Sequence, residues 1–231
     1  VDKWEIIKGP SLQDNPRYID PSVRNSIILD STHYAAIHYY SQSHGEYWYT
    51  FPIYHNYRGI IITDDGGRNW KEIHTEVLMS SLGSSEGVDL ENHNRSIAYP
   101  SLNRIIVVGD SSERLTTDLY DERFRTYAKM LMTSDGGKNW EKIILDSNTH
   151  GQDICMLDDQ RGIWAVSSRG NKFNSFPVYF SILYTEDCWK TYRKIYESPH
   201  NGKFFEEPLS FPGPKKIAFL EGTDTLVLSE D

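Results

Sequence analysis

The sequence predicts an all-β fold built from a repeated strand–turn–strand unit. Residues 59–73, 129–143 and 181–195 align without gaps, and each contains an apolar strand, a short polar turn, an aromatic residue and a second strand. The chain has 231 residues, which is enough to bury a core without disulfides or metals. Its 38% hydrophobic and 25% charged residues are typical of a globular protein.

Further strands are expected where β-branched or aromatic residues form short runs between turn residues. Such runs lie at residues 25–29, 33–39, 104–108, 153–157, 162–167 and 216–220. The one helix that we expect lies within residues 117–127, a highly charged segment. Strands therefore dominate the predicted fold.

The turns of the three repeats share the pattern Thr-x-Asp-x-x-x-x-(Trp/Tyr). The aspartate carboxylate can accept hydrogen bonds from backbone N–H groups of its own turn. Two glycines after the aspartate supply the positive φ that a tight turn requires. In the third repeat Cys188 and Trp189 replace these glycines, so we expect that turn to differ in detail. The residues assigned to the turns are Thr63, Asp65, Gly67, Trp70, Thr133, Asp135, Gly137, Trp140, Thr185, Asp187 and Tyr192.

These turns resemble Asp boxes, the bacterial-neuraminidase (BNR) repeats of sialidase-like β-propellers, sortilin-like receptors and photosystem-assembly propellers. In those families the box joins the third and fourth strands of a blade. The resemblance implies a small β-propeller, and the spacing of the aspartates fits blades of about 40–50 residues with one insertion. We expect a single domain over residues 1–231 with four or five blades. A strand at residues 2–7 is expected to complete the last blade, which contains residues 225–231, and to close the ring.

Composition limits the classes of partner. The net charge of −9 excludes the broad basic face that binding to duplex nucleic acid requires. No apolar run approaches the roughly 20 residues of a membrane-spanning helix. Because the chain begins at Val1, we expect a processed or trimmed form, and the sequence leaves open whether a signal segment or a lipid-anchored cysteine was removed. Cys155 and Cys188 are the two cysteines, and the sequence leaves open whether they pair.

No catalytic or metal-binding motif accompanies the repeats. The Arg-Ile-Pro signature of sialidases is absent, as are nucleophile elbows, His-Glu-x-x-His and Cys-x-x-Cys. His33, His38, His44 and His55 fall in one stretch, but their spacing fits no known ligand pattern. Because a shared fold does not carry an activity with it, we expect no catalysis, no cofactor and no metal.

Two groups of residues are candidates for partner binding. Residues 38–58 are rich in tyrosine and tryptophan, which are favoured at protein interfaces but also pack in cores, and both roles remain open. Residues 80–94 form a long polar segment whose acids, with those of residues 118–122, can form a patch that steers a basic partner. The candidate residues are Tyr40, Tyr47, Trp48, Tyr49, Tyr54, Glu86, Asp89, Glu91, Asp118, Asp121 and Glu122.

These observations favour a non-catalytic, protein-binding propeller. The resemblance to Asp-box proteins, which are mostly exported, implies a periplasmic or secreted location. In size, acidity and apparent processing the chain is similar to periplasmic immunity proteins that neutralise lipase effectors of type VI secretion. One alternative is a carbohydrate-binding or sialidase-like glycosidase module, which predicts arginines and acids converging near Trp48 or Trp164. Another is an envelope assembly or scaffold factor.

Overall fold

The computed structural model describes residues 18–48, 51–82, 94–114, 124–147, 149–169, 177–198, 210–213, 216–221 and 225–229. These residues form fifteen strands in four sheets. The chain divides into two compact units, residues 1–91 and 92–231. Within the described ranges, no helix is long and apolar enough to cross a membrane.

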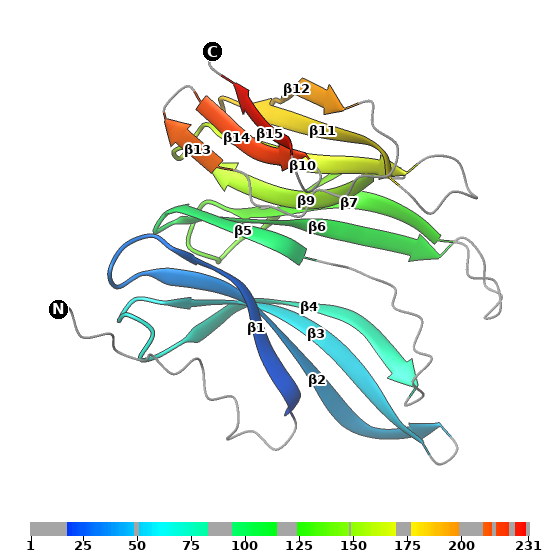
Figure 1. Ribbon diagram of the computed structural model, residues 1–231. Coiled ribbons are helices and arrows are strands. Elements are labelled where there is room, and N and C mark those ends of the chain that lie inside the picture. Colours follow the sequence, from blue (N-terminus) through cyan, green and yellow to red (C-terminus); the bar gives the residue numbers. More distant parts are fainter. Residues whose placement is uncertain are drawn as a thin grey trace. The chain divides into compact units, whose positions relative to one another are not determined.

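The first unit is a four-stranded antiparallel sheet in which sequential strands are neighbours (Figure 1). Its core strands carry apolar runs: Ala35, Ala36 and Ile37 are fully buried, and Ile60 and Ile61 nearly so. The strands are β1 (Tyr18–Ile28), β2 (Tyr34–Trp48), β3 (Phe51–Thr63) and β4 (Lys71–Leu82).

The second unit contains three sheets, and two of them repeat the four-stranded meander of the first unit. One is formed by β5 (Asn94–Ser101), β6 (Arg104–Arg114), β7 (Phe124–Thr133) and β8 (Glu141–Ser147). The next is formed by β9 (Thr149–Met156), β10 (Gly162–Arg169), β11 (Pro177–Thr185) and β12 (Arg193–Ser198). The last has three strands, β13 (Ser210–Gly213), β14 (Lys216–Glu221) and β15 (Thr225–Ser229).

The strand order confirms the expected fold class, an all-β fold of the small β-propeller type, because three of the four described sheets are four-stranded meanders. The Thr-x-Asp turns join β3 to β4, β7 to β8 and β11 to β12, which are the third and fourth strands of their sheets. The strand expected at residues 2–7 lies outside the described residues, and with it the closure of the ring. The single domain over residues 1–231 stays a prediction.

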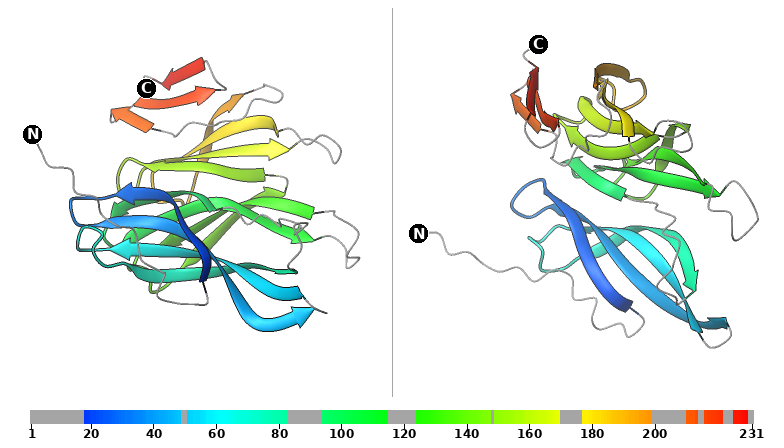
Figure 2. Two further views of the ribbon diagram at one scale, coloured as in Figure 1. Left: turned by 60° about the horizontal axis from the view of Figure 1, so that its bottom comes forward. Right: turned by 45° about the vertical axis from the view of Figure 1, so that its right-hand side comes forward.

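The core of the second unit lies where the β5–β8 sheet faces the β9–β12 sheet (Figure 2). Val108 and Met130 from the first of these sheets pack in one cluster with Trp164 and Leu183 from the second. Trp164 is completely buried, and its ring meets Trp189 edge to face with centroids 6.0 Å apart. The carbohydrate alternative placed a binding cluster near Trp164, and this burial leaves that side chain no surface to offer a sugar.

The prediction of a helix within residues 117–127 is wrong for the last four of these residues. Phe124 to Tyr127 begin β7 and pair with the end of β6, with Phe124 opposite Arg114 and Tyr127 opposite Ser111. The charge pattern of this segment suggested a helix, but aromatic and β-branched residues paired with a neighbouring strand favour β-structure. Residues 117–123 lie outside the described part of the chain.

Candidate functional site

The first Thr-x-Asp turn, residues 63–70, is closed by the carboxylate of Asp65. The hydroxyl of Thr63 donates to Asp65 Oδ1 over 2.8 Å, and the backbone N–H of Asn69 donates to the same oxygen over 2.9 Å. The side-chain amide of Asn69 donates to Asp65 Oδ2 over 2.7 Å, and Trp70 Nε1 donates to the carbonyl of Gly67 over 3.0 Å. The aspartate thus accepts hydrogen bonds within its own turn, as predicted. The second turn, residues 133–140, repeats these bonds with Thr133, Asp135, Gly137, Asn139 and Trp140.

The same hydrogen bonds keep the turn carboxylates ionised. The backbone and side-chain donors of Asn69, with the hydroxyl of Thr63, lower the pKa of Asp65 to about 2. The corresponding donors of Asn139 lower the pKa of Asp135 to about 2. Hydrogen bonds to the charged form favour that form. These carboxylates are therefore structural acceptors and hold no proton that they could donate near neutral pH.

Replacing Asp65 with asparagine is expected to destabilise the protein at neutral pH and to matter less as the pH falls. The folded-state pKa of Asp65, about 2, lies below the ordinary value of 3.8, so its contribution is present above that ordinary value and is lost as the pH falls toward about 2. The measurement is the urea midpoint of wild type and variant at a series of pH values from 7 down to 2. Asp64→Asn, at the neighbouring exposed position, is the matched control. A midpoint difference for Asp65→Asn that stays constant over this range would contradict the assignment.

The third turn, residues 185–192, keeps the left-handed backbone positions of the other two and differs from them in detail, since Thr185 Oγ1 also donates to the carbonyl of Thr191 over 2.8 Å. Cys188 and Trp189 have φ angles of 56° and 66°, in the left-handed region where the first turn has Gly66 and Gly67 at 73° and 87°. The backbone N of Trp189 donates to Thr185 Oγ1 over 2.9 Å, as that of Gly67 does to Thr63. Packing explains the exception, because both Cys188 and Trp189 are buried in the core of the second unit.

No disulfide joins Cys155 and Cys188. Cys188 is buried, with its sulfur 3.4 Å from the sulfur of Met132, and burial raises the pKa of its thiol. Cys155 is half buried on β9. A thiol held in its neutral form is a poor nucleophile, so Cys188 acts as a packing residue.

Each Thr-x-Asp turn is braced by the turn between the first and second strands of its own sheet. In every case a backbone N–H at the first left-handed position donates to a backbone carbonyl of the bracing turn. The donor and acceptor pairs are Gly66 with Thr32, Gly136 with Asn103 and Cys188 with Gln160, at 2.9, 2.9 and 2.8 Å. No side-chain pattern marks these acceptors, which is why the sequence did not point to them.

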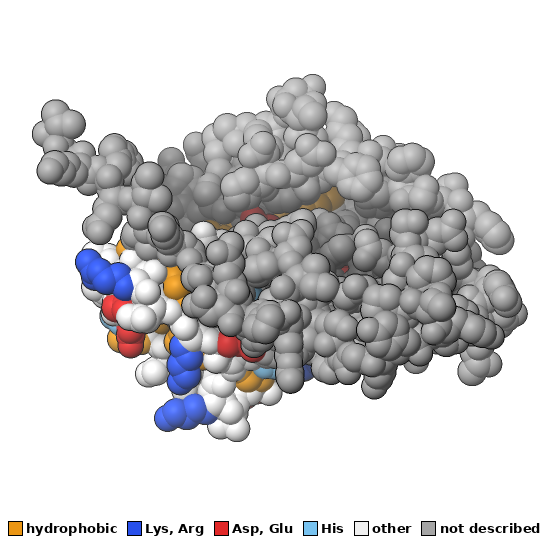
Figure 3. Space-filling model, turned by 90° about the horizontal axis from the view of Figure 1, so that it is seen from below, with side chains coloured by type: hydrophobic (Ala, Val, Ile, Leu, Met, Phe, Trp, Pro, Cys, Tyr) orange, Lys and Arg blue, Asp and Glu red, His pale blue; other side chains and the backbone are white. Residues whose placement is uncertain are grey.

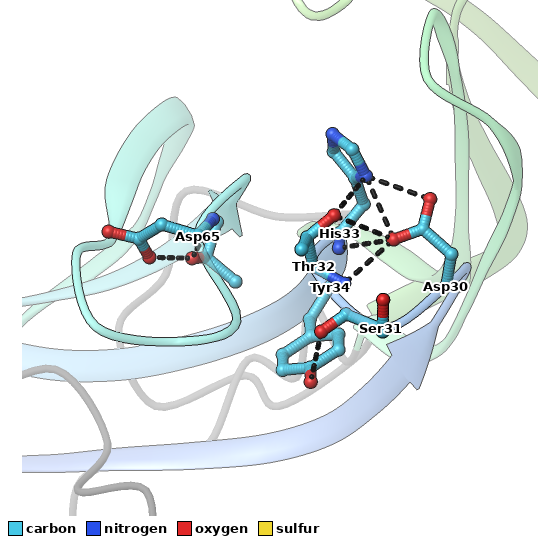
Figure 4. A network of polar contacts seen from close by, with 7 residues as sticks. Asp30, Ser31, Thr32, His33, Tyr34 and Asp65 are labelled. Carbon is cyan, nitrogen blue, oxygen red and sulfur yellow. Dashed lines mark hydrogen bonds and ion pairs between the residues drawn. The ribbon is translucent and has the colours of Figure 1, made fainter.

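Asp30 shapes one of these bracing turns (Figure 4). Its Oδ1 accepts from the backbone N of Thr32 over 2.8 Å and from the backbone N of His33 over 2.9 Å. These donors hold the pKa of Asp30 well below its usual range. His33 Nδ1 lies 2.8 Å from Asp30 Oδ2, so His33 takes part in the turn. Asp158 fills the same place in the β9–β10 turn, where it accepts from the backbone of Gln160 and Arg161.

The structure joins the predicted aromatic segment into one hairpin of β2 and β3. Tyr40 pairs with Tyr57, and Trp48 pairs with Phe51 beside the hairpin end. Tyr47 lies on β2 and Tyr54 on β3, and the side chains of residues 39–58 are outside the described part of the structure. Tyr49 lies outside the described residues entirely, as do all the predicted acidic candidates: Glu86, Asp89, Glu91, Asp118, Asp121 and Glu122. On the face in Figure 3, the described side chains of both charges lie among hydrophobic ones, without a one-sign patch.

A buried Asp–His pair joins two sheets of the second unit. His150 Nδ1 on β9 lies 3.1 Å from Asp110 Oδ2 on β6, and the backbone N of Gly151 donates to Asp110 Oδ1 over 2.8 Å. Both side chains are buried, with 2% of Asp110 and 8% of His150 exposed, and His150 Nε2 has no hydrogen-bond partner among the described residues. A Cβ on Gly151 would lie 2.5 Å from the carbonyl oxygen of Gly109, so the two backbones meet here without room for a side chain. The pair fixes this approach of the sheets.

The second unit also holds a groove that no sequence pattern indicated. It has a volume of about 350 Å³ and is lined by residues from β8 to β12 and by Tyr192, which precedes β12; we call it the β8–β12 groove. Ile144, Tyr179 and Tyr192 line it, and each is about half exposed. Tyr192 was predicted as a turn residue, and the structure gives it a second position on the groove. Long-range packing creates the groove, so local sequence patterns carry no sign of it.

Comparison with known proteins leaves the family open. No family model matches the chain, and no curated protein matches it. A solved structure described as "YCF48 bound to D1 peptide" aligns with 99% of this chain and 85% of that chain, at 11% identity and a TM-score of 0.33. The fold class therefore rests on the strand order and on the position of the Thr-x-Asp turns within each sheet.

Proposed function

We propose that this chain is a non-catalytic protein-binding module that works in the periplasm or outside the cell. The observation that carries the proposal is the β2–β3 hairpin, in which strand pairing brings together the two parts of the tyrosine- and tryptophan-rich segment, residues 38–48 and 51–58. Directly paired residues on a hairpin interact side by side, and tyrosine and tryptophan supply much of the binding energy at protein interfaces. The ionised turn carboxylates add to the case, because they are already engaged as structural acceptors.

More specifically, we propose an immunity protein that binds and neutralises a secreted toxin of the lipase type. An inhibitor of this kind needs a stable scaffold and a large binding surface rather than catalytic groups. The net charge of −9 favours rapid association with a basic partner. A toxin that must be blocked before it acts requires such rapid binding.

The experiment is affinity capture from the envelope fraction of the source organism, followed by binding measurements with the purified partner. Wild type is expected to retain one stoichiometric protein, and Trp48→Ala is expected to weaken its binding at least about 30-fold, the effect of an interface hot spot. Leu102→Ala, on the exposed β5–β6 turn, is the control and should bind as wild type does. Loss of the partner's lipase activity on adding the chain would support the immunity role.

Two results would overturn the proposal. A partner that binds wild type and Trp48→Ala with the same affinity would remove the hairpin from the interface. Capture of no protein, together with specific binding to a glycan array, would favour the carbohydrate alternative. The thermal midpoint of each variant shows whether a loss of binding reflects a loss of folding.

A further inference from the structure

The β8–β12 groove collects hydrophobic side chains that the fold leaves half exposed. Five large hydrophobic residues are exposed in the described part of the chain, and three of them line this groove. They are Ile144, Tyr179 and Tyr192, with exposed fractions of 48%, 46% and 47%. Val166 and Leu183, which belong to the buried core cluster, also line the groove. A concave apolar surface gains free energy when a ligand displaces water from it.

The sheets are irregular where they line the groove. The β7–β8 pairing shifts register next to Ile144, and the β11–β12 pairing shifts between Ile182 and Leu183. The β10–β11 pairing shifts directly after Ser168. Register shifts re-aim side chains and recur beside functional sites. They allow consecutive residues such as Ile144 and Leu145 to line the same groove, although a regular strand would point them to opposite faces.

Two strands beside the groove end the strand order of their sheets. β8 pairs with β7 alone, and β12 pairs with β11 alone, among the strands that the structure describes. The outer edge of a terminal strand offers backbone N–H and C=O groups to an added segment. An extended peptide uses such groups for its own backbone while pockets take its side chains. The edges therefore favour a peptide over a sugar.

The chemistry of the lining specifies an uncharged ligand. The charged residues of the lining are Lys194 and Glu197, which form an ion pair with each other and so leave the groove neutral. The hydroxyls of Ser167, Ser168 and Ser181 supply polar groups beside the apolar floor. A volume of about 350 Å³ lies at the lower end of the range of ligand sites, roughly 300–1,000 Å³, and suits one bulky side chain with its adjoining backbone.

We propose that the β8–β12 groove binds an extended segment of a partner protein that inserts one bulky, uncharged hydrophobic side chain between Ile144, Tyr179 and Tyr192. This assignment rests on the protein-binding function proposed above and adds a second contact surface to it. The serine hydroxyls and the outer edges of β8 and β12 receive the backbone of the segment.

The test uses peptides selected against the full chain from a phage-displayed library of random 12-residue sequences. The selected peptides, labelled with fluorescein, are titrated by anisotropy against wild type, Ile144→Glu, Tyr179→Ser and the control Leu102→Glu. Leu102 is 52% exposed on the β5–β6 turn of the same unit but does not line the groove, so its variant carries the same new charge elsewhere. We expect a shared bulky hydrophobic residue among the peptides. Binding should be at least about tenfold weaker in both groove variants and unchanged in the control.

The outcomes separate this inference from the proposed function. Peptides that bind Ile144→Glu and Tyr179→Ser as tightly as wild type would overturn the groove assignment and leave protein binding through the hairpin intact. Failure to enrich any peptide with a common hydrophobic residue would also overturn it. Glycan-array binding that both groove variants abolish would show a carbohydrate site instead. Urea midpoints within the error of wild type establish that each variant folds.

Discussion

Replacing Trp189 with glycine is expected to lower the free energy of unfolding by about 3 kcal/mol. This value is the packing energy lost with the buried indole minus the strain energy that is relieved at the left-handed φ. The φ of this residue is 66°, a conformation that glycine adopts without cost. Its indole ring is 2% exposed and meets Trp164 edge to face in the core of the second unit. The lost packing outweighs the relieved strain, so the variant is less stable.

Cys188→Gly is the matched comparison, because Cys188 shares the left-handed conformation but has a small side chain. Relief of the backbone strain stabilises the folded state by about 1–2 kcal/mol. Removing the buried thiol and making the unfolded chain more flexible destabilise the folded state by a similar amount. The variant is therefore expected to unfold within about 1 kcal/mol of wild type. Its φ of 56° and its burial, at 5% exposed, set this balance.

Urea unfolding of the two variants distinguishes packing from turn geometry as the support of the third turn. The slope of the unfolding free energy with urea should remain that of wild type, which shows that both variants unfold from the same folded state. Equal destabilisation of Trp189→Gly and Cys188→Gly would mean that the turn conformation, not the indole, sets the stability. A Trp189→Gly variant as stable as wild type would contradict the core assignment.

Turn chemistry is the part of this fold that the sequence predicted well. The bonds that close the first turn link Thr63, Asp65 and Asn69, which are at most six residues apart, so one short pattern contains all of them. The glycines of the first two turns mark the left-handed positions directly. The left-handed positions of the third turn could not be predicted in this way, because tertiary packing holds Cys188 and Trp189 in a conformation that their residue types disfavour.

The groove and the buried pair were not predictable from a local pattern. Ile144 and Tyr179 reach the same groove from different sheets, and Asp110 meets His150 across forty residues of chain. The bracing carbonyl of Thr32 belongs to the backbone and has no residue signature at all. The helix prediction was wrong at residues 124–127 for the same reason. Phe124 pairs with Arg114 on a neighbouring strand, and a local charge pattern does not indicate such a pairing.

Asp110→Ala is expected to lower the free energy of unfolding by about 3 kcal/mol, since it leaves buried polar groups without their acceptor. The carboxylate serves two groups on β9, the backbone N of Gly151 and the imidazole of His150. Asp110 is 1% exposed and His150 is 6% exposed, so water does not readily replace the lost contacts. Asp110→Asn retains an oxygen that can accept from Gly151 and is expected to lose only about 1 kcal/mol.

Hydrogen exchange at the amide of Gly151 measures whether this one hydrogen bond is formed, which an unfolding experiment does not show. Its N–H donates to Asp110 Oδ1 over 2.8 Å, so its protection should fall sharply in Asp110→Ala and persist in Asp110→Asn. If the alanine variant fails to fold, the asparagine variant still tests the bond through this one amide. Unchanged protection and stability in Asp110→Ala would show that the close approach of Gly109 and Gly151 holds the sheets together without the carboxylate. Because no side chain fits between these two glycines, the hydrogen bond to Asp110 is the directional contact that sets how the β9 backbone lies against β6.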